Sequence, residues 1–357
     1  MIIPGGIGLI KNYENFELIN ELINDFVTKG KPIAGMCSAL RLIQKFISPD
    51  VFKNKEEITE ATGYYYDNDY NIYDTPAFRR IKNKNESAQG IDFMIQALKT
   101  CYTRRMVIMR IIISPAKKMK VDTDFLDYNQ LPHFINDTEI LMEYLKGLSY
   151  EDLKQLWNCN AKIATLNYER VQKMDLYSNL TPAILAFEGI QYQYMTPGVF
   201  EANEFEYLEE HLRILSGFYG ILSPFDGVVP YRLEMQAKLK GENLNSLYEF
   251  WNSKLADKLF SESRCIVNLA SKEYSKCILR YLNEKIQFVT CVFGEMINEK
   301  VVEKGTFAKM ARGEMVRFMA ENKVEDIEDI KNFNRLSYVF AGHLSDENTY
   351  VFIKNEK

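Results

Sequence analysis

The chain has 357 residues, of which 46% are hydrophobic and 26% are charged, a composition typical of globular proteins. Its longest apolar runs, such as residues 106–113, are interrupted by Arg110 and fall short of the roughly 20 residues that a bilayer requires. The N-terminus lacks the basic and apolar regions of a signal peptide. We therefore expect a cytoplasmic protein that has no membrane partner.

The cysteines and the charge limit the possible kinds of site in two further ways. The six cysteines are scattered without a CxxC pair, so free thiols are expected rather than a disulfide framework or a zinc site. The net charge of −5 divides unevenly, because residues 1–108 carry 14 basic and 13 acidic side chains and the remainder carries 30 and 36. A part with a net charge of −6 repels phosphate, so nucleic-acid binding there requires a local basic patch.

The first hundred residues show strand and turn patterns. Met1–Gly6 predicts the end of a buried strand and a glycine turn, and Phe16–Phe26 has the apolar spacing of a helix. Lys31–Ala39 predicts a short strand that runs into a sharp turn carrying Cys37, with a helix from about Leu40. A cysteine at such an elbow lies near a helix N-terminus, whose dipole favours the thiolate.

These patterns resemble the ThiJ/PfpI class of glutamine-amidotransferase-like proteins, in which a Pro-Gly-Gly turn, a Gly-Lys-Pro-Ile strand and an Ala-x-x-Cys elbow recur; residues 87–93 fit as well. The resemblance implies an incomplete, doubly wound, flavodoxin-like fragment over residues 1–100, because the half that supplies the acidic partner of the cysteine is absent. No histidine precedes His133, so a Cys-His pair cannot form within this part. We interpret Cys37 as an ordinary buried thiol in a remnant.

Residues 101–108 join the two parts without the Pro, Gly or Ser enrichment of a natural linker. Arg104-Arg105 can be encoded by AGGAGG, a bacterial ribosome-binding sequence, a few codons before Met109. We hypothesise that two adjacent genes have been fused, or read as one through a frameshift or assembly error. A single native product of 41.7 kDa on a blot would contradict the artefact version.

The second part, residues 109–357, alternates buried strands with helices. The strand 110–113 ends in a turn that carries Lys117, and the strand 265–270 ends at Ser271, a natural N-cap, followed by Lys272 and Glu273. Polar and basic side chains at the carboxyl ends of strands can form an anion site, although taken alone these lysines fit a solvated loop better.

Other elements of this part are predicted from apolar runs and spacing. They are a strand at 182–189, a long helical stretch from 204 into 212–220, an amphipathic helix at 247–259, a strand at 287–293 and a helix at 307–322. If residues 230–235 are extended, Arg232 and Glu234 share one face, where they can hold a phosphate, a substrate carboxylate or each other. Basic side chains at Lys309, Arg312 and Arg317 mark one face of the last helix, usually a solvated surface.

Two helices are predicted at Tyr150–Trp157 and Ala161–Met174, with only three residues between them. So short a connection makes a helix pair that can present backbone amides and basic side chains to DNA phosphates. Lys162 and Arg170 are eight residues apart and therefore on one face. The alternative is that the pair is part of a helical core layer.

Several motifs of the second part occur together and in order. They are Ile113-Ser114-Pro115-Ala116-Lys117, Ala186-Phe187-x-Gly189, His211-Leu212-Arg213-x-Leu215-Ser216-Gly217-x-Tyr219-Gly220-x-Leu222-x-Pro224, Pro230-Tyr231-Arg232-Leu233-Glu234-Met235, Tyr248-x-Phe250-Trp251, Val267-Asn268-Leu269-Ala270-Ser271-x-Glu273-Tyr274 and Ala311-Arg312-Gly313-x-Met315-x-Arg317-Phe318. Together they resemble the YaaA family of bacterial peroxide-stress proteins over essentially all of residues 109–357.

The resemblance implies a mixed-sheet α/β fold with an embedded helix-hairpin-helix and a basic cleft. It also implies a protein that binds double-stranded DNA and helps to limit unincorporated iron and oxidative DNA damage. Carried over by position, the hairpin falls on residues 151–173, with Lys162 and Arg170 as DNA-binding residues. The cleft would take Lys117, Arg213, Arg232, Lys272, Lys309 and Arg312. Glu188 departs from family members that carry lysine there, which makes this rim less basic.

A second hypothesis is an enzyme that acts on an anionic, nucleotide-like small molecule. Arg232 and Lys272 would clamp the anion, and Glu234 or Glu273 would be the catalytic acid or base. Direct iron binding has little support, because the three histidines are far apart and no two-His-one-carboxylate spacing occurs. His211, beside an apolar residue in a predicted helix, is expected to pack or cap. We expect neither a metal nor a cofactor.

Overall fold

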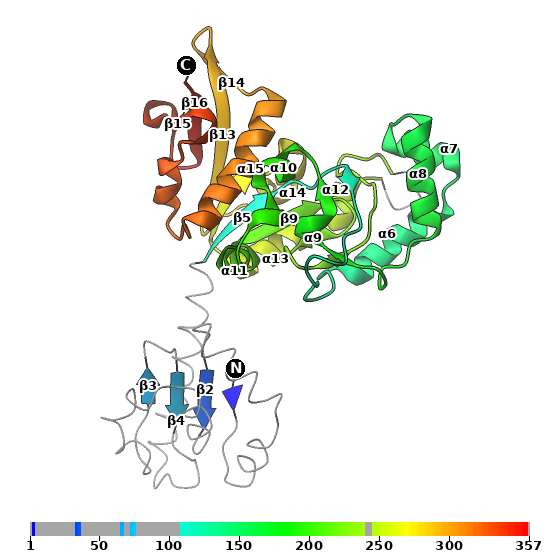
Figure 1. Ribbon diagram of the computed structural model, residues 1–357, viewed down its shortest axis with the longest axis horizontal. Helices are drawn as coiled ribbons and strands as arrows, with labels where there is room; N and C mark the ends of the chain where they lie inside the picture. Colours follow the sequence, from blue (N-terminus) through cyan, green and yellow to red (C-terminus); the bar gives the residue numbers. More distant parts are fainter. Residues whose placement is uncertain are drawn as a thin grey trace. The chain divides into compact units, whose positions relative to one another are not determined.

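A computed structural model of the chain describes residues 108–239 and 245–355 in full and, nearer the N-terminus, the backbone of four short strands. The chain divides into two compact units, Met1–Arg105 and Met106–Lys357. The strands of the smaller unit, drawn in Figure 1, are β1 (Ile2–Ile3), β2 (Ile33–Met36), β3 (Tyr65–Asp67) and β4 (Ile72–Thr75).

These four strands form one sheet in the order β1-β2-β4-β3, in which only β3 is antiparallel to its neighbour. Strands therefore occupy the two places where Met1–Gly6 and Lys31–Ala39 predicted them. The predicted helices of this unit and Cys37 lie outside the described residues. The flavodoxin-like fragment stays a prediction.

The larger unit is built on a mixed sheet of eight strands. Their order is β10-β9-β5-β12-β13-β16-β15, with β14 paired to the end of β13. The bounds are β5 (Met109–Ile113), β9 (Leu212–Ser216), β10 (Gly220–Leu222), β12 (Cys265–Leu269), β13 (Gln287–Ile297), β14 (Lys300–Val302), β15 (Tyr338–Phe340) and β16 (Thr349–Lys354). The five inner strands are parallel, and β10 and β15 close the edges as antiparallel strands.

The central strands are apolar because both faces of the sheet are covered. All five residues of β5 are buried, and so are all five of β9. Continuous apolar runs of this kind are typical of parallel strands that helices cover on both faces. The mixed α/β class predicted for this part of the chain is confirmed.

The helices fall into groups that Figure 1 shows around the sheet. α6, α7 and α8 lie together on one side of the unit, and α15 lies on the other side against α10 and β13. The helices are α6 (Ile135–Gly147), α7 (Tyr150–Trp157), α8 (Ala161–Gln172), α9 (Ala183–Ala186), α10 (Ile190–Met195), α11 (Ala202–His211), α12 (Leu247–Trp251), α13 (Lys254–Glu262), α14 (Lys272–Leu279) and α15 (Gly305–Glu321). Short 3-10 turns η4 (Pro197–Val199), η5 (Ile327–Asn332), η6 (Arg335–Ser337) and η7 (Gly342–Leu344) complete the chain path.

Three predicted elements were wrong. The strand at 182–189 is mainly the short helix α9, flanked by the two-residue strands β7 (Thr181–Pro182) and β8 (Phe187–Glu188). The helix from 204 stops at His211, and the next five residues form β9. A short apolar run that is buried on every side does not distinguish a helix from a strand by its spacing. The helix at 247–259 is two helices, because Asn252 adopts the left-handed region, with φ 44°.

The boundaries of the hairpin were predicted closely. α7 is Tyr150–Trp157 as predicted, and α8 ends two residues earlier than predicted, at Gln172. Asn158 ends α7 in the left-handed conformation, and the Asn160 side chain accepts a hydrogen bond from the Ile163 amide at the start of α8. Within the described part of the chain, no helix combines the length and the apolar character needed to cross a membrane.

Candidate anion-binding cleft

A cleft opens where β5 and β12 end. The two strands are adjacent and parallel, but the chain leaves β5 toward β9 on one side and leaves β12 toward β13 on the other. Such a switch in direction leaves a crevice at the carboxyl ends of the two strands, which is where ligands bind in open α/β sheets. The structure has a cavity of about 340 Å³ at this point.

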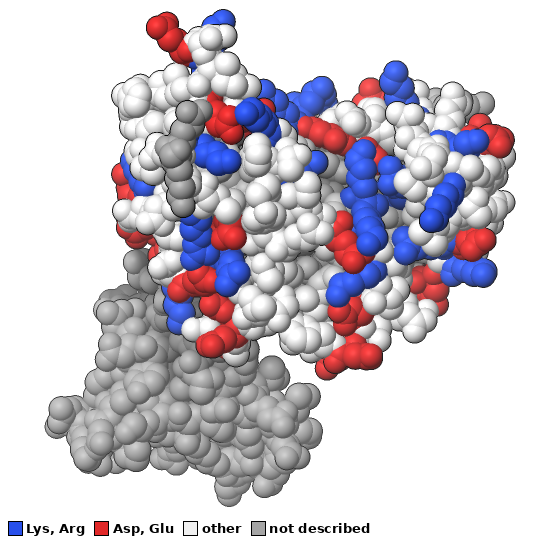
Figure 2. All heavy atoms as spheres, turned by 45° about the horizontal axis from the view of Figure 1, so that its top comes forward, with Lys and Arg blue, Asp and Glu red and all other residues white. Residues whose placement is uncertain are grey.

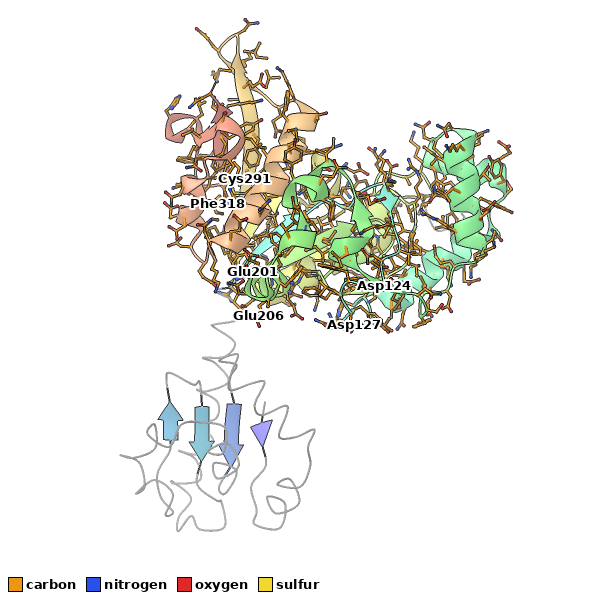
Figure 3. The ribbon with its side chains drawn as sticks, in the orientation of Figure 1. Asp124, Asp127, Glu201, Glu206, Cys291 and Phe318 are labelled. Atoms are coloured by element: carbon orange, nitrogen blue, oxygen red, sulfur yellow. The ribbon has the colours of Figure 1, made fainter. Side chains whose placement is uncertain are left out.

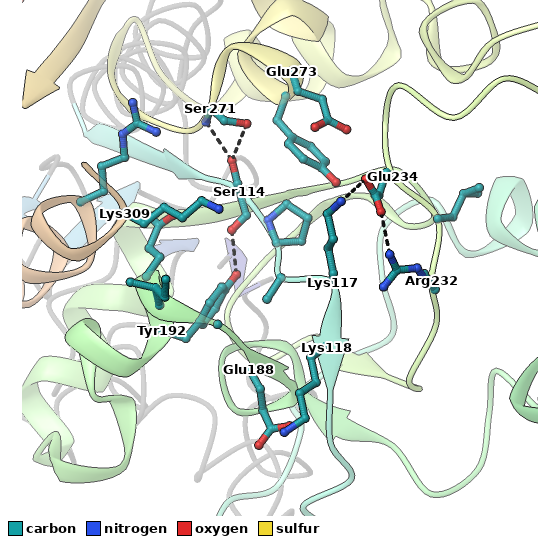
Figure 4. Close-up of a pocket in the computed structure, with 18 of the residues that line it drawn as sticks. Ser114, Lys117, Lys118, Glu188, Tyr192, Arg232, Glu234, Ser271, Glu273 and Lys309 are labelled. Carbon is teal, nitrogen blue, oxygen red and sulfur yellow. Dashed lines mark hydrogen bonds and ion pairs between the residues drawn. The ribbon is translucent and has the colours of Figure 1, made fainter. Parts of the chain in front are cut away.

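Five basic side chains and three carboxylates line the cleft. The basic residues are Lys117, Lys118, Arg232, Lys309 and Arg312, and the acidic ones are Glu188, Glu234 and Glu273. Figure 4 shows that they come from both sides of the crevice, with the Lys309 side chain extending toward Ser114. The surplus of positive charge favours an anionic ligand.

The floor of the cleft is fixed by hydrogen bonds between the two strand ends. The Ser114 hydroxyl, directly after β5, accepts a bond of 2.8 Å from the Ser271 amide and lies 3.3 Å from the Ser271 hydroxyl. The Tyr192 hydroxyl donates to the Ser114 carbonyl at 3.1 Å. Ser271 is the N-cap of α14 as predicted, but its side chain bonds Ser114 rather than a helix amide.

Glu234 is held between two cations. Its Oε2 lies 2.6 Å from Lys117 Nζ, and its Oε1 accepts from Arg232 at 3.2 Å. Arg232 and Glu234 therefore share a face, as the alternation at 230–235 predicted, and they bind each other. Figure 4 shows this arrangement along one wall. Both oxygens of Glu234 keep further lone pairs for a ligand hydroxyl.

Glu273 lies on the same wall in a different environment. Burial raises the pKa of its carboxyl above the usual value, and the neighbouring Glu234 adds to this rise. The Gln236 amide donates to Glu273 Oε1 at 3.2 Å, which opposes the rise. A carboxyl with a raised pKa beside a second carboxyl that contacts two cations fits the pattern of paired acid and base groups.

Several donors in the cleft have no acceptor. Among the described residues, five buried side-chain nitrogens lack a hydrogen-bond partner, and three of them belong to cleft residues: Gln191, Arg232 and Arg312. A buried donor without an acceptor costs about 1–3 kcal/mol. An anion that brings oxygens into the cleft can remove this cost.

Comparison with known proteins identifies the family of the chain. The family described as peroxide stress protein YaaA matches residues 109–344, about two thirds of the sequence. The chain belongs to the YaaA family. This match confirms the family resemblance that the sequence motifs suggested for residues 109–357. The family name also agrees with the expected class, a peroxide-stress protein.

Individual YaaA relatives match over nearly their whole length. A UPF0246 protein of Lachnoclostridium phytofermentans is 57% identical over 248 residues, which are 70% of this chain and 97% of that protein. A UPF0246 protein of Agathobacter rectalis is 57% identical over 244 residues, covering 68% and 98%. The YaaA family match begins at residue 109, so the resemblance of residues 1–100 to ThiJ/PfpI proteins stays a prediction.

Six basic residues were predicted for the YaaA cleft, and the structure brings four of them together. Lys117, Arg232, Lys309 and Arg312 line the cavity, as do the catalytic candidates Glu234 and Glu273. Lys272 is exposed at the start of α14 and does not line it. Arg213 lies in β9, buried among other charged groups.

Arg213 belongs to a closed charge cluster. Glu262 Oε2 accepts from Arg213 Nε at 2.8 Å and from Arg110 Nε at 3.0 Å, and Lys258 lies 3.0 Å from Glu262 Oε1. Arg213 Nη1 donates to the main-chain carbonyls of Leu212 and Glu209, Arg213 Nη2 lies 2.8 Å from Glu262 Oε2, and Arg110 Nη1 donates to the Glu210 carbonyl. This Glu262 cluster, made of Arg110, Arg213, Lys258 and Glu262, leaves Arg213 no donor for a ligand in the cleft.

The two hairpin residues differ in exposure. Lys162 is exposed near the start of α8, whereas Arg170 is half-buried and donates to the Met119 carbonyl at 3.3 Å. Met119 ends β6 (Lys118–Met119), which pairs with β8 at the rim of the cleft. Arg170 therefore connects α8 to that rim. There Glu188 and Lys118 form an ion pair of 2.9 Å, which offsets one rim cation.

Sequence reasoning missed part of the lining. Gln191, Tyr192 and Tyr274 line the cleft, but the strand predicted at 182–189 gave no reason to look at α10. One signal was present: Ser114 follows β5 directly, and Ser271 follows β12 after a single residue. Neighbouring parallel strands bring such residues together at one edge of the sheet.

Three thiols of this YaaA domain are unsuited to react with peroxide. Burial raises the pKa of Cys265 to about 11, and it raises those of Cys277 and Cys291 to about 12. Cys291, labelled in Figure 3, is fully buried in β13. These thiols stay protonated at neutral pH, and the thiolate is the reactive form. In the described ranges, no group of three or more His, Cys, Asp or Glu is arranged to hold a metal ion.

Proposed function

We propose that the chain acts in the peroxide stress response as a DNA-associated protein that helps to limit unincorporated iron and oxidative DNA damage. The observation that carries this proposal is the position of the hairpin. Trp157 and Asn158, at the end of α7, line a cavity that shares Glu234 with the anion cleft. Phosphates bound at the exposed start of α8, beside Lys162, would lie close to the basic cleft.

The charge distribution limits how strongly DNA can be held. On the face that Figure 2 shows, Lys and Arg form separate groups interleaved with Asp and Glu, so no continuous basic surface covers that face. Binding would then rest on a few phosphate contacts, without base readout. We expect modest affinity for every duplex sequence and a clear decrease as salt is raised.

A salt titration with the full-length chain tests the DNA proposal. Binding to a short duplex should weaken steeply between low and physiological salt, and Lys162→Glu should reduce affinity for every sequence tested while lowering the salt slope. Lys285→Glu is the matched control, because it makes the same charge change at an exposed position just before β13, at the opposite end of the strands. Binding that salt does not affect would disprove the proposal.

A second function is favoured by the cleft itself. Its three buried donors without acceptors, and its carboxyl pair Glu234 and Glu273, suit an enzyme that acts on an anionic, nucleotide-like small molecule. In this proposal Arg232 and Lys309 hold the anion, and Glu273 is the acid or base. Lys309 takes the place of Lys272, which the sequence paired with Arg232, because Lys272 does not line the cavity.

Calorimetric titration with pyrophosphate, a compact anion, tests the second function. Wild-type protein should bind it, and Arg232→Gln should bind it at least tenfold more weakly, because a charge-assisted hydrogen bond contributes about 1.5–3 kcal/mol. Lys285→Gln should leave the affinity unchanged. If the wild-type protein does not bind pyrophosphate at either of two temperatures, the cleft is not an anion site.

A further inference from the structure

A second cavity adjoins the cleft. It has a volume of about 460 Å³ and lies between the end of α6, the end of α7 and residues 234–238. Glu234 lines both cavities, so the two are neighbours on either side of this carboxylate. Residues 232–234 border the cleft and residues 234–238 border the second cavity, which makes this segment the wall between them.

The second cavity differs chemically from the cleft. Its described lining has one cation, Lys238, and is otherwise apolar, acidic or amide-bearing. Leu148, Leu156 and Ala237 supply apolar surface, and Trp157 supplies an aromatic ring. An anion would meet only one cation there. A flat, uncharged ring with polar edges could contact the apolar and aromatic surface and hydrogen-bond the polar side chains.

Trp157 carries an unused hydrogen-bond donor. The residue is 3% exposed, and its indole Nε1–H is buried without an acceptor. The other tryptophan of the chain shows the usual arrangement, since Trp251 Nε1 donates to the Gly217 carbonyl at 3.0 Å. A buried indole N–H normally finds a partner. Five buried side-chain nitrogens in the described residues have no partner. Four of them belong to residues that line these two cavities, namely Trp157 in the second cavity and Gln191, Arg232 and Arg312 in the cleft.

The carboxylate between the cavities suits a sugar. Glu234 contacts Lys117 and Arg232, and its carboxylate oxygens keep lone pairs that can accept hydrogen bonds from ligand hydroxyls. In nucleotide sites an acidic residue between the phosphate and base positions commonly accepts the ribose hydroxyls. The order of groups along the two cavities is therefore cations, then a carboxylate, then an aromatic and apolar pocket.

We propose that the two cavities together bind one nucleotide. Its phosphates lie in the cleft against Arg232, Lys309 and Arg312, its ribose hydroxyls bond Glu234, and its base occupies the second cavity with an acceptor directed at Trp157 Nε1. The proposal rests on the anion site described above and adds where the sugar and the base of the ligand bind. It assigns Trp157 and Ala237 to base recognition.

Two ligands that differ only by the nucleoside test the second cavity separately from the cleft. ADP and pyrophosphate share the two phosphate groups and differ by the nucleoside, so titrating the full-length chain with each isolates the second cavity. We expect ADP to bind at least tenfold more tightly than pyrophosphate. Ribose 5-phosphate, which has the sugar without the base, should bind less tightly than AMP.

Fluorescence reports on the base position directly, because the chain has only two tryptophans. In Trp251→Phe the remaining indole is Trp157, and its emission should change with ADP and not with pyrophosphate. Trp157→Phe keeps a ring and loses the N–H, so ADP should bind about five- to tenfold more weakly while pyrophosphate binding is unchanged. Ala237→Leu should abolish the preference for ADP by filling the pocket, which provides a second variant should Trp157→Phe fail to fold.

Three outcomes would overturn the proposal. If pyrophosphate binds and ADP binds no better, or if neither variant changes the preference, the anion site stands and the base site does not. If neither ligand binds to wild-type protein, the anion site and the nucleotide proposal both fall.

Discussion

The Glu262 cluster and the cleft are both rich in arginine, but they use it differently. In the cluster, both arginines have partners for Nε and for at least one terminal nitrogen, and Glu262 accepts from both. In the cleft, Arg232 and Arg312 each have one ion pair and a buried Nε without an acceptor. A closed set of contacts stabilises the fold, whereas an incomplete set at a strand end is available to a ligand.

The largest effect on stability is expected from breaking the closed set of contacts in the Glu262 cluster. Glu262→Gln removes the carboxylate between two buried arginines, and we expect the free energy of unfolding to fall by about 3–5 kcal/mol because the positive charges lose their partner. Denaturant unfolding measures this. Glu169→Gln, at an exposed position of α8, is the control and should change stability by less than about 0.5 kcal/mol. An equally small loss in both variants would show that the cluster is not structural.

The same carboxylate should make stability depend on pH. Burial alone would raise its pKa, but Arg213 and Arg110 lower the pKa of Glu262 from 4.5 to about 2. A lowered folded-state pKa gives stability that is present above pH 4.5 and lost as the pH falls through 2. The shift corresponds to about 3 kcal/mol. The stability difference between wild type and Glu262→Gln should therefore shrink as the pH falls from 4.5 toward 2, and a constant difference would contradict this.

Asp226 should act in the opposite sense. Burial raises the pKa of its carboxyl to about 6, although Gln130 and the Ser223 amide donate to it. A raised folded-state pKa of an acid gives stability that is present below pH 3.8 and lost as the pH rises through 6. Unfolding at pH 4 and pH 7 should show this contribution decreasing with pH in wild type, and its loss in Asp226→Asn. A difference that does not change with pH would contradict it.

In the cleft, the expected effects are on binding and not on folding. Lys309 is exposed, and no ion pair of this residue occurs in the described part of the chain, so Lys309→Met should change unfolding by less than about 0.5 kcal/mol. Pyrophosphate affinity should fall about tenfold as one cation is lost. Lys285→Met controls for net charge. A loss of stability without a loss of affinity would place Lys309 with the structural charges.

The smallest effect is expected at the rim. Glu188→Lys would replace a partly exposed ion pair with Lys118, which contributes at most about 1 kcal/mol, by a second cation. Duplex and pyrophosphate affinity should rise a few-fold at low salt, and the gain should disappear at high salt through screening. Glu169→Lys makes the same charge change at an exposed position of α8 and should give a smaller gain.

The sequence predicted the strands that carry the cleft, and it predicted less of the cleft itself. β5 and β12 were recognisable as buried runs that end in polar turns, and the alternation of Arg232 and Glu234 was correct. Arg213 was assigned to the cleft by its position in the family motif, but it lies in β9 and its guanidinium binds Glu262 instead. Gln191 and the second cavity could not be predicted, because they depend on which segments meet in space.

Two glycines set how closely the walls of the cleft approach. A side chain at Gly217 would come within 2.5 Å of the Leu233 carbonyl, and one at Gly313 would overlap the carbonyl of Gln191. Neither glycine lines the cavity where a ligand would lie. Gly217 instead allows close packing against the main chain of Leu233 and Glu234, and Gly313 allows close packing against the main chain of Gln191. A genetic screen for lost function should therefore recover substitutions at these two positions alongside the charged residues. Their phenotype would come from the width of the cleft and not from its chemistry.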